Sequence, residues 1–220
     1  MVEHTRRTVC ALGGGLAMAA MGGGVQAEDA APVAMTRHGR VRGYLDGDIK
    51  VFKGVRYGAD TTTRRFQPPV PPRAWRGIVD ATAYGHASPQ KSDEPDQDED
   101  CLFLNIWTPA LADGGRRPVM VYVHGGAHAN GSGSSPLYDG AALCRRGDVV
   151  VVTLNHRLNV FGYNGLGQLL GGAYAASGSV GNLDLILALE WVRDSIATSA
   201  AIRGTSPCSA SPAAAPRSLR

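Results

Sequence analysis

The sequence predicts an α/β fold in which helices cover both faces of a sheet. Two near-continuous apolar runs rich in Val, residues 119–123 and 149–154, are typical of strands that are buried on both sides. A short helix-forming segment, residues 138–147, lies between them, and a longer amphipathic segment follows at residues 182–197. Strand, helix, strand and helix in this order indicate the opening of an α/β architecture.

Length and charge narrow the class of protein. The 220 residues are enough for one good-sized hydrophobic core or for part of a larger one, and 44% hydrophobic with 19% charged residues is typical of a globular chain. The net charge of +3 comes from the two ends of the chain, and the part between residues 28 and 198 has a net charge of −1. No basic surface is therefore predicted for nucleic acid or for an anionic membrane.

Residues 1–27 have the features of an export signal. The pair Arg6-Arg7 precedes the weakly apolar stretch "ALGGGLAMAAMGGGV", and "VQA" supplies the small residues that a signal peptidase requires, with cleavage expected after Ala27. The apolar stretch is too short and too rich in Gly to span a bilayer as a helix. A twin-arginine signal predicts export of folded protein to the periplasm or the medium, and the alternative is a disordered N-terminus.

Residues 33–90 are expected to form short strands and turns. "GRVRGYL" and "IKVFKGVRY" alternate as hairpin strands do, while the prolines of "RFQPPVPPRAW" exclude helix. Six acidic residues between positions 93 and 100 lack the Gly turn and the distal Glu of a calcium loop, so a solvated loop is expected.

The second half should alternate between loops and helices. Residues 138–147 form a short helix that ends at Gly147, and residues 163–181 form a loop rich in Gly, Ala and Ser. Asn182 begins the long helix, with Asp184 in its first turn. Its apolar face is predicted from five residues at helical spacing, namely Leu185, Ile186, Leu189, Val192 and Ile196.

The segment "VYVHGGAHANGS", residues 121–132, carries the chemistry. A buried strand runs directly into Gly125-Gly126-Ala127, and small residues let backbone N–H groups approach a ligand closely. Such a loop can build an oxyanion hole, although an ordinary glycine turn is the alternative. His124 and His128 do not form a zinc site, because H-E-x-x-H needs a helix and a Glu.

Other polar side chains have no clear chemical role in the sequence. His124 is expected to hold the Gly-rich loop by hydrogen bonds, whereas His38 and His156 have no partner that the sequence identifies. Whether Cys101 pairs with Cys144 stays open, since spacing alone does not decide it.

Six ordered blocks of sequence identify a family. "FKGVRYG", "RFQPPVPPRAWRGIVDATAYGHASPQ", "EDCLFLNIWTP", "PVMVYVHGGAHANGS", "VVVVTLNHRLNVFGY" and "GNLDLILALEWVRDSIA" resemble, in order and spacing, those of the type B carboxylesterases. This family of α/β-hydrolases includes cholinesterases and bacterial para-nitrobenzyl esterases. The resemblance covers residues 37–198, and it implies an incomplete α/β-hydrolase fold that holds the N-terminal strands and first helices of the sheet only.

The resemblance also implies a reaction. A Ser nucleophile, a His base and an orienting Glu or Asp would hydrolyse a small-molecule carboxylic ester, with no cofactor and no metal. Gly126 and Ala127 would supply two of three oxyanion N–H groups, and Gly125 would shape the turn. His156 departs from the family, which usually has Tyr there, and Cys101 matches a disulfide position without a nearby partner.

The C-terminal residues 199–220 differ from the family's sequence at the point where its nucleophile is expected. After Thr198 the family continues F-G-G-D-P and then G-x-S-x-G, but this chain has no G-x-S-x-G. With suitable synonymous codons for residues 199–217, one added base gives F-G-G-D-P-G-H-V-T-V-F-G-Q-S-G-G-G-A-K. The hypothesis is therefore a single-base deletion after Thr198, either in the gene or in its sequencing.

Three segments follow from these observations: a signal at residues 1–27, a partial carboxylesterase type B domain at residues 33–198, and a disordered, out-of-frame tail at residues 199–220. As printed, the sequence lacks the nucleophile, the acid and the base, so it is expected to be inactive. The alternative is a non-catalytic module for binding or adhesion, since some relatives of this fold act in that way.

Overall fold

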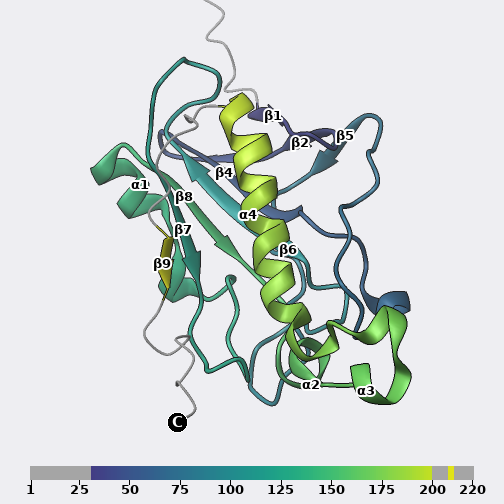
Figure 1. Cartoon of the computed structure of the whole chain (residues 1–220). Coiled ribbons are helices and arrows are strands. Elements are labelled where there is room, and N and C mark those ends of the chain that lie inside the picture. The colour runs from purple at the N-terminus through teal and green to yellow at the C-terminus, as the bar shows by residue number, and fades with distance from the viewer. Residues whose placement is uncertain (1–30, 200–207, 211–220) are drawn as a thin grey trace, which may run out of the picture. The chain divides into compact units, whose positions relative to one another are not determined.

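The computed structural model describes residues 31–199 and 208–210 (Figure 1). The predicted export signal, residues 1–27, and most of the predicted tail, residues 199–220, lie outside the described residues. The described part contains a six-stranded sheet, a three-stranded sheet and four α-helices. No helix among these residues is long and apolar enough to cross a membrane.

The larger sheet is mixed, with strand order β3-β4-β6-β8-β7-β9. The first four of these strands pair antiparallel, and β8, β7 and β9 are parallel to one another. The strands, in sheet order, are β3 (Tyr44–Asp46), β4 (Ile49–Arg56), β6 (Phe103–Thr108), β8 (Val150–Leu154), β7 (Val119–Val123) and β9 (Cys208–Ala210). The hairpin predicted around residues 39–57 is confirmed by β3 and β4.

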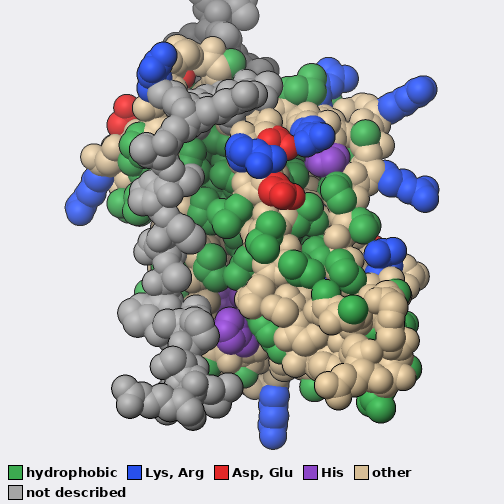
Figure 2. Space-filling view, viewed as in Figure 1, with side chains coloured by type: hydrophobic (Ala, Val, Ile, Leu, Met, Phe, Trp, Pro, Cys, Tyr) green, Lys and Arg blue, Asp and Glu red, His purple; other side chains and the backbone are tan. Residues whose placement is uncertain are grey.

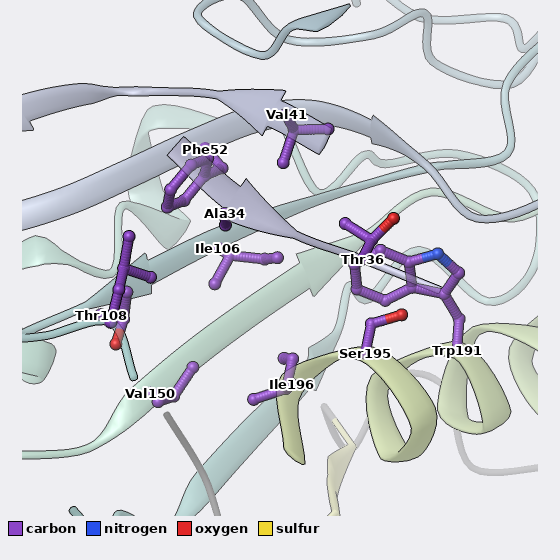
Figure 3. A pocket seen from close by; sticks show the side chains of 11 residues that line it. Ala34, Thr36, Val41, Phe52, Ile106, Thr108, Val150, Trp191, Ser195 and Ile196 are labelled. Atoms are coloured by element: carbon purple, nitrogen blue, oxygen red, sulfur yellow. The ribbon is translucent and has the colours of Figure 1, made fainter. Parts of the chain in front are cut away.

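The smaller sheet consists of β1 (Val33–Met35), β2 (Arg40–Arg42) and β5 (Ile78–Asp80). An apolar cavity of about 30 Å³ lies between this sheet, β6, β8 and the C-terminal half of the long helix (Figure 3). Figure 3 shows Thr36, Ser195 and Trp191 on one side of the cavity and Val150 with Ile106 on another. Because Val150 is the first residue of β8, the cavity lies at the edge of the sheet where the parallel strands begin.

Two hydrophobic clusters cover opposite faces of the larger sheet. Val150, Val152 and Leu154 of β8 pack into one cluster with α4 (Val180–Ser199). Val151 packs into the other with α1 (Ala141–Gly147). Alternate side chains of one strand thus enter both clusters, which confirms the predicted sheet with helices on both faces. Figure 1 shows α4 crossing the near face and α1 on the far side.

Strand β7 and helix α4 differ from the expectations. Every second residue of β7, Met120 and Tyr122, is only half-buried, so this strand is less enclosed than β8. The apolar face predicted for the long helix is wrong in part, because Ile186 is 52% and Leu189 38% exposed. Figure 2 shows hydrophobic side chains gathered on the face that α4 crosses.

The face of α4 that packs on the sheet is a different stripe. Val192 and Ile196 are buried as predicted, but they share this stripe with Asp184, Ala188 and Trp191. The helix is turned this way because the Asp184 carboxylate binds Arg157 below it. The helix also begins at Val180, two residues before the predicted Asn182.

The predicted loop at residues 163–181 contains short helical elements. Helix α2 (Asn159–Tyr163) ends at the first residue of this predicted loop. Helix α3 (Gly167–Leu170) lies within the loop and is followed by two 3₁₀ turns. Small residues predicted a loop there because they pack little apolar surface, but they also allow tight turns.

The acidic loop is solvated at Asp93, Asp96 and Asp98, as predicted. Its other three acidic residues bind neighbouring elements: Glu94 accepts a hydrogen bond from Ser132, Glu99 pairs with Arg65, and Asp100 pairs with Arg56. Cys101 and Cys144 are both free and buried. Each lies in a different hydrophobic cluster, which answers the question of their pairing.

Candidate active site

The C-terminal end of β7 is a topological switch point of the sheet. The chain passes from β7 through α1 to β8 on one side, and after α4 it returns as β9 on the other side of β7. Val123 is aligned with Leu154 of β8 and with Ala210 of β9, so these three strands end level with one another. Ligands of open α/β sheets bind outside the carboxyl ends of the strands at such a point.

Residues 124–131, here called the 124–131 loop, leave β7 at this point. Gly126, Ala127 and His128 all have positive φ angles, of 120°, 54° and 64°. Within the described part of the chain, the N–H groups of Gly126 and Ala127 donate to no backbone or side-chain acceptor. Ala127 is exposed and Gly126 half-buried, so both N–H groups can meet a ligand. Two adjacent free donors at a strand end can stabilise a negative oxygen.

Two glycines of this loop, Gly126 and Gly131, are required by close backbone contacts. A Cβ on Gly126 would lie 1.9 Å from the backbone oxygen of Asn130. A Cβ on Gly131 would lie 2.5 Å from the backbone oxygen of Gly125, and Gly131 has a φ of 103°. The Ala129 N–H donates to the Gly126 oxygen over 3.0 Å. The loop therefore folds back on itself, and its return end packs on its first turn.

His124 holds the start of this loop, as predicted. Its ring Nδ1 lies 2.9 Å from the Gly125 oxygen, while its Nε2 is buried without a hydrogen-bond partner in the described part of the chain. The His156 ring, from the segment after β8, lies 4.9 Å away between centroids and is also buried. Neither nitrogen of His156 has a partner among the described residues.

Burial first, and then the neighbouring His124 and His128, lower the pKa of His156 to about 3. Burial also lowers the pKa of His124. Both rings are thus neutral at neutral pH. The ring of His128 lies 4.6 Å from that of Tyr163 and 6.5 Å from that of His156. Residues 31–199 and 208–210 contain no group of three or more side chains suited to hold a metal ion.

The segment after β8 is fixed by a buried ion pair. The Asp184 carboxylate accepts from the Arg157 backbone N–H over 3.0 Å, from Nε over 2.9 Å and from an Nη over 2.6 Å. Arg157 and Asp184 are 2% and 0% exposed. Leu158 and Asn159 follow directly, and the Asn159 N–H donates to the His128 oxygen over 2.7 Å. The ion pair thus anchors the segment that supports the 124–131 loop.

No nucleophile with a base is found in the part whose side chains are described. No hydroxyl or thiol of residues 31–196 donates to a histidine ring. Ser132 is nearby, but its hydroxyl binds Glu94. His38, for which the sequence identified no partner, lies far from this site, against Trp75.

Two side chains that bind the last residue of the 124–131 loop and the residue after it were not found from the sequence. Gln90 bonds to Gly131, and Glu94 to Ser132. Both residues lie about 40 positions before their partners, so no local pattern links them. The only signal was that Gln90 ends one of the family-like blocks.

Comparison with known proteins places the chain. The model of the carboxylesterase family matches residues 30–199. Over 173 residues the chain is 41% identical to the para-nitrobenzyl esterase of Bacillus subtilis, covering 74% of this chain and 35% of that protein. Over 179 residues it is 37% identical to the fumonisin B1 esterase of Sphingopyxis macrogoltabida, covering 78% and 33%.

Solved structures agree with this likeness. The crystal structure of a carboxylesterase from Geobacillus stearothermophilus superposes with a TM-score of 0.74 at 49% identity, covering 77% of this chain and 35% of that one. These neighbours are α/β-hydrolases, so the predicted fold class is confirmed, and the chain spans about a third of the length of the relatives it matches.

Proposed function

Because the chain belongs to the carboxylesterase family, we propose that it carries the oxyanion-binding part of a carboxylic-ester hydrolase. The observation that supports this function is the pair of N–H groups on Gly126 and Ala127, which donate to no acceptor among the described residues and lie at the switch point of the sheet. The names of the relatives, para-nitrobenzyl esterase and fumonisin B1 esterase, favour a small-molecule ester as substrate rather than a nucleic acid or a membrane.

The 124–131 loop has one task in this reaction. Attack of a Ser hydroxyl on the ester carbonyl carbon converts the carbonyl oxygen to an oxyanion, while a His accepts the hydroxyl proton and an acid orients that His. The N–H groups of Gly126 and Ala127 donate to the oxyanion, and Gly125 lets the chain turn away from β7. Each such donor contributes about 3 kcal/mol to the stability of the transition state.

We also propose that a single-base deletion after Thr198 moved the nucleophile out of frame. The restored frame reads V-F-G at the positions of β9 and places a Ser where the sequence has Pro212. Strand β9 lies parallel to β7, with Ala210 level with Val123. In the restored chain, a Ser two residues after the end of β9 would follow that strand at the edge of the sheet where the 124–131 loop follows β7. This expected placement supports the proposal.

Turnover of para-nitrophenyl acetate tests both proposals. The printed chain is compared with the chain from a gene that has one base inserted after the Thr198 codon. We expect turnover only from the restored chain, and replacing the restored Ser at the position of Pro212 by Ala should abolish it. No turnover from either chain would contradict the hydrolase and favour a non-catalytic binding or adhesion module.

Export is a further proposal for the first 27 residues. Arg6-Arg7 and the stretch up to Ala27 support a twin-arginine signal and a periplasmic or secreted protein. Fractionation of producing cells tests it. The chain should leave the cytoplasm, and the double variant Arg6→Lys, Arg7→Lys should remain there. Equal export of both chains would contradict the signal.

A further inference from the structure

The side chain of Gln90 makes a two-point contact with the backbone of Gly131. Its Oε1 accepts from the Gly131 N–H over 2.6 Å, and its Nε2 donates to the Gly131 oxygen over 2.9 Å. One amide side chain thus satisfies both backbone groups of one residue, as a neighbouring strand would. Gln90 therefore fixes both the place and the orientation of this residue.

Gly131 is the point at which the 124–131 loop returns to its own beginning. The site of its missing Cβ lies 2.5 Å from the Gly125 oxygen and 2.6 Å from the ring Nδ1 of His124. The preceding residue, Asn130, lies even closer to Gly126, since a Cβ added to Gly126 would lie 1.9 Å from the backbone oxygen of Asn130. A displacement of Gly131 must therefore displace the turn that carries the Gly126 and Ala127 N–H groups.

This turn needs a restraint from outside. Gly126, Ala127 and His128 are consecutive residues at positive φ, and for the latter two this conformation is strained. A strained turn persists only when its surroundings hold it. Described contacts that hold the loop from outside include the Asn159 N–H on the His128 oxygen, the Tyr163 ring against the His128 ring, and Gln90 on Gly131.

Gln90 is itself well anchored. Its backbone N–H donates to the side-chain oxygen of Gln97 over 2.7 Å, and its Nε2 also donates to the Ser88 oxygen over 3.1 Å. The neighbouring Pro89 oxygen accepts from the Asn159 side chain over 2.7 Å. The restraint on Gly131 is therefore connected to the segment after β8, which the buried ion pair fixes.

From these contacts we propose that Gln90 is a positioning residue for the oxyanion donors: its amide holds Gly131 so that the Gly126 and Ala127 N–H groups face the substrate. The proposal rests on the proposed hydrolase function. It gives Gln90 no contact with the substrate, and it predicts a loss of rate rather than a loss of binding.

Hydrogen exchange of the printed chain tests the hold on the loop without any need for activity. Gln90→Leu removes both hydrogen bonds to Gly131 with a side chain of similar size. Gln90→Glu keeps the acceptor for the Gly131 N–H but loses the donor to the Gly131 oxygen. We expect the Ala129 amide to exchange at least tenfold faster in Gln90→Leu and less so in Gln90→Glu. Amides of β8 should be unchanged. Gln168→Leu, at an exposed position of α3, is the matched control.

Kinetics of the frame-restored chain complete the test. Gln90→Leu should lower kcat at least tenfold with KM within twofold, and Gln168→Leu should change neither. Unchanged exchange at Ala129, an equal rise in β8, or an unchanged kcat would each overturn the proposal. If the restored chain with Gln90 intact shows no turnover, the hydrolase function fails, and the exchange experiment still decides whether Gln90 holds the loop.

Discussion

Replacing Asp184 by Asn should strongly destabilise the fold. The Asp184 carboxylate accepts three hydrogen bonds from Arg157, and both side chains are almost completely buried. An Asn oxygen can keep the two bonds at the Oδ2 position, but its NH₂ group would face the Arg157 Nη donor. The buried guanidinium is then left without a counter-charge.

The expected cost follows from this geometry. Removing one partner of a buried ion pair typically costs about 3–5 kcal/mol, because the other charge stays in the interior. With an unfolding slope of roughly 2 kcal/mol/M, the urea midpoint should fall by about 2 M. Tryptophan fluorescence during urea unfolding measures this shift, since Trp191 lies on the same helix.

Asp80→Asn is the matched control. The pair Arg42–Asp80 has an N···O distance of 3.1 Å, but its side chains are 45% and 64% exposed. Water screens such a pair, so the same chemical change should cost less than about 1 kcal/mol. A loss below 1 kcal/mol for Asp184→Asn, or equal losses for the two variants, would refute the reasoning.

Three further predictions concern the site. Burial holds the pKa of His156 near 3, while an unfolded His has a pKa of about 6.5, so the unfolded state binds the proton more readily between these values. The contribution of His156 to stability is full above pH 6.5 and should fall by about 2 kcal/mol by pH 5 in urea titrations. The loss should be smaller in His156→Tyr, which keeps only the lowered pKa of His124. Gly126→Ala should lower kcat of the frame-restored chain at least 100-fold toward para-nitrophenyl acetate, whereas Gly77→Ala, also at positive φ but with open space around it, should leave kcat unchanged. Tyr57→Phe removes the 2.6 Å bond to the Asn155 oxygen and should cost about 1–2 kcal/mol in urea unfolding; no loss would mean that this buried bond contributes nothing.

The sequence alone was sufficient for the layers of the fold. Apolar runs such as residues 149–154 predict buried strands because a strand between two helical layers must be apolar on both faces. The Gly-rich segment after β7 predicts the candidate site for a similar reason, since only small residues allow a backbone to approach a ligand. Both signals are local in the chain, so a short window of sequence contains them.

Long-range polar contacts were not predictable in this way. Asp184 was expected merely to favour the first turn of its helix, but its partner Arg157 lies 27 positions away and determines which face of α4 is buried. Ile186 and Leu189 are exposed for this reason. Gln90 and Gly131 are 41 positions apart, and neither residue type indicates the other.

The labelling rates of the two buried thiols, Cys101 and Cys144, can report how the structure opens. Cys101 and Cys144 are each 0% exposed, and burial raises the pKa of both, to about 11 for Cys144. A thiol reagent can reach either sulfur only when its surroundings open, because both side chains are buried. The raised pKa also keeps the thiolate, which is the nucleophile, scarce in the closed structure. Since the two cysteines lie in the clusters on opposite faces of the sheet, their separate labelling rates would report which helical layer detaches first.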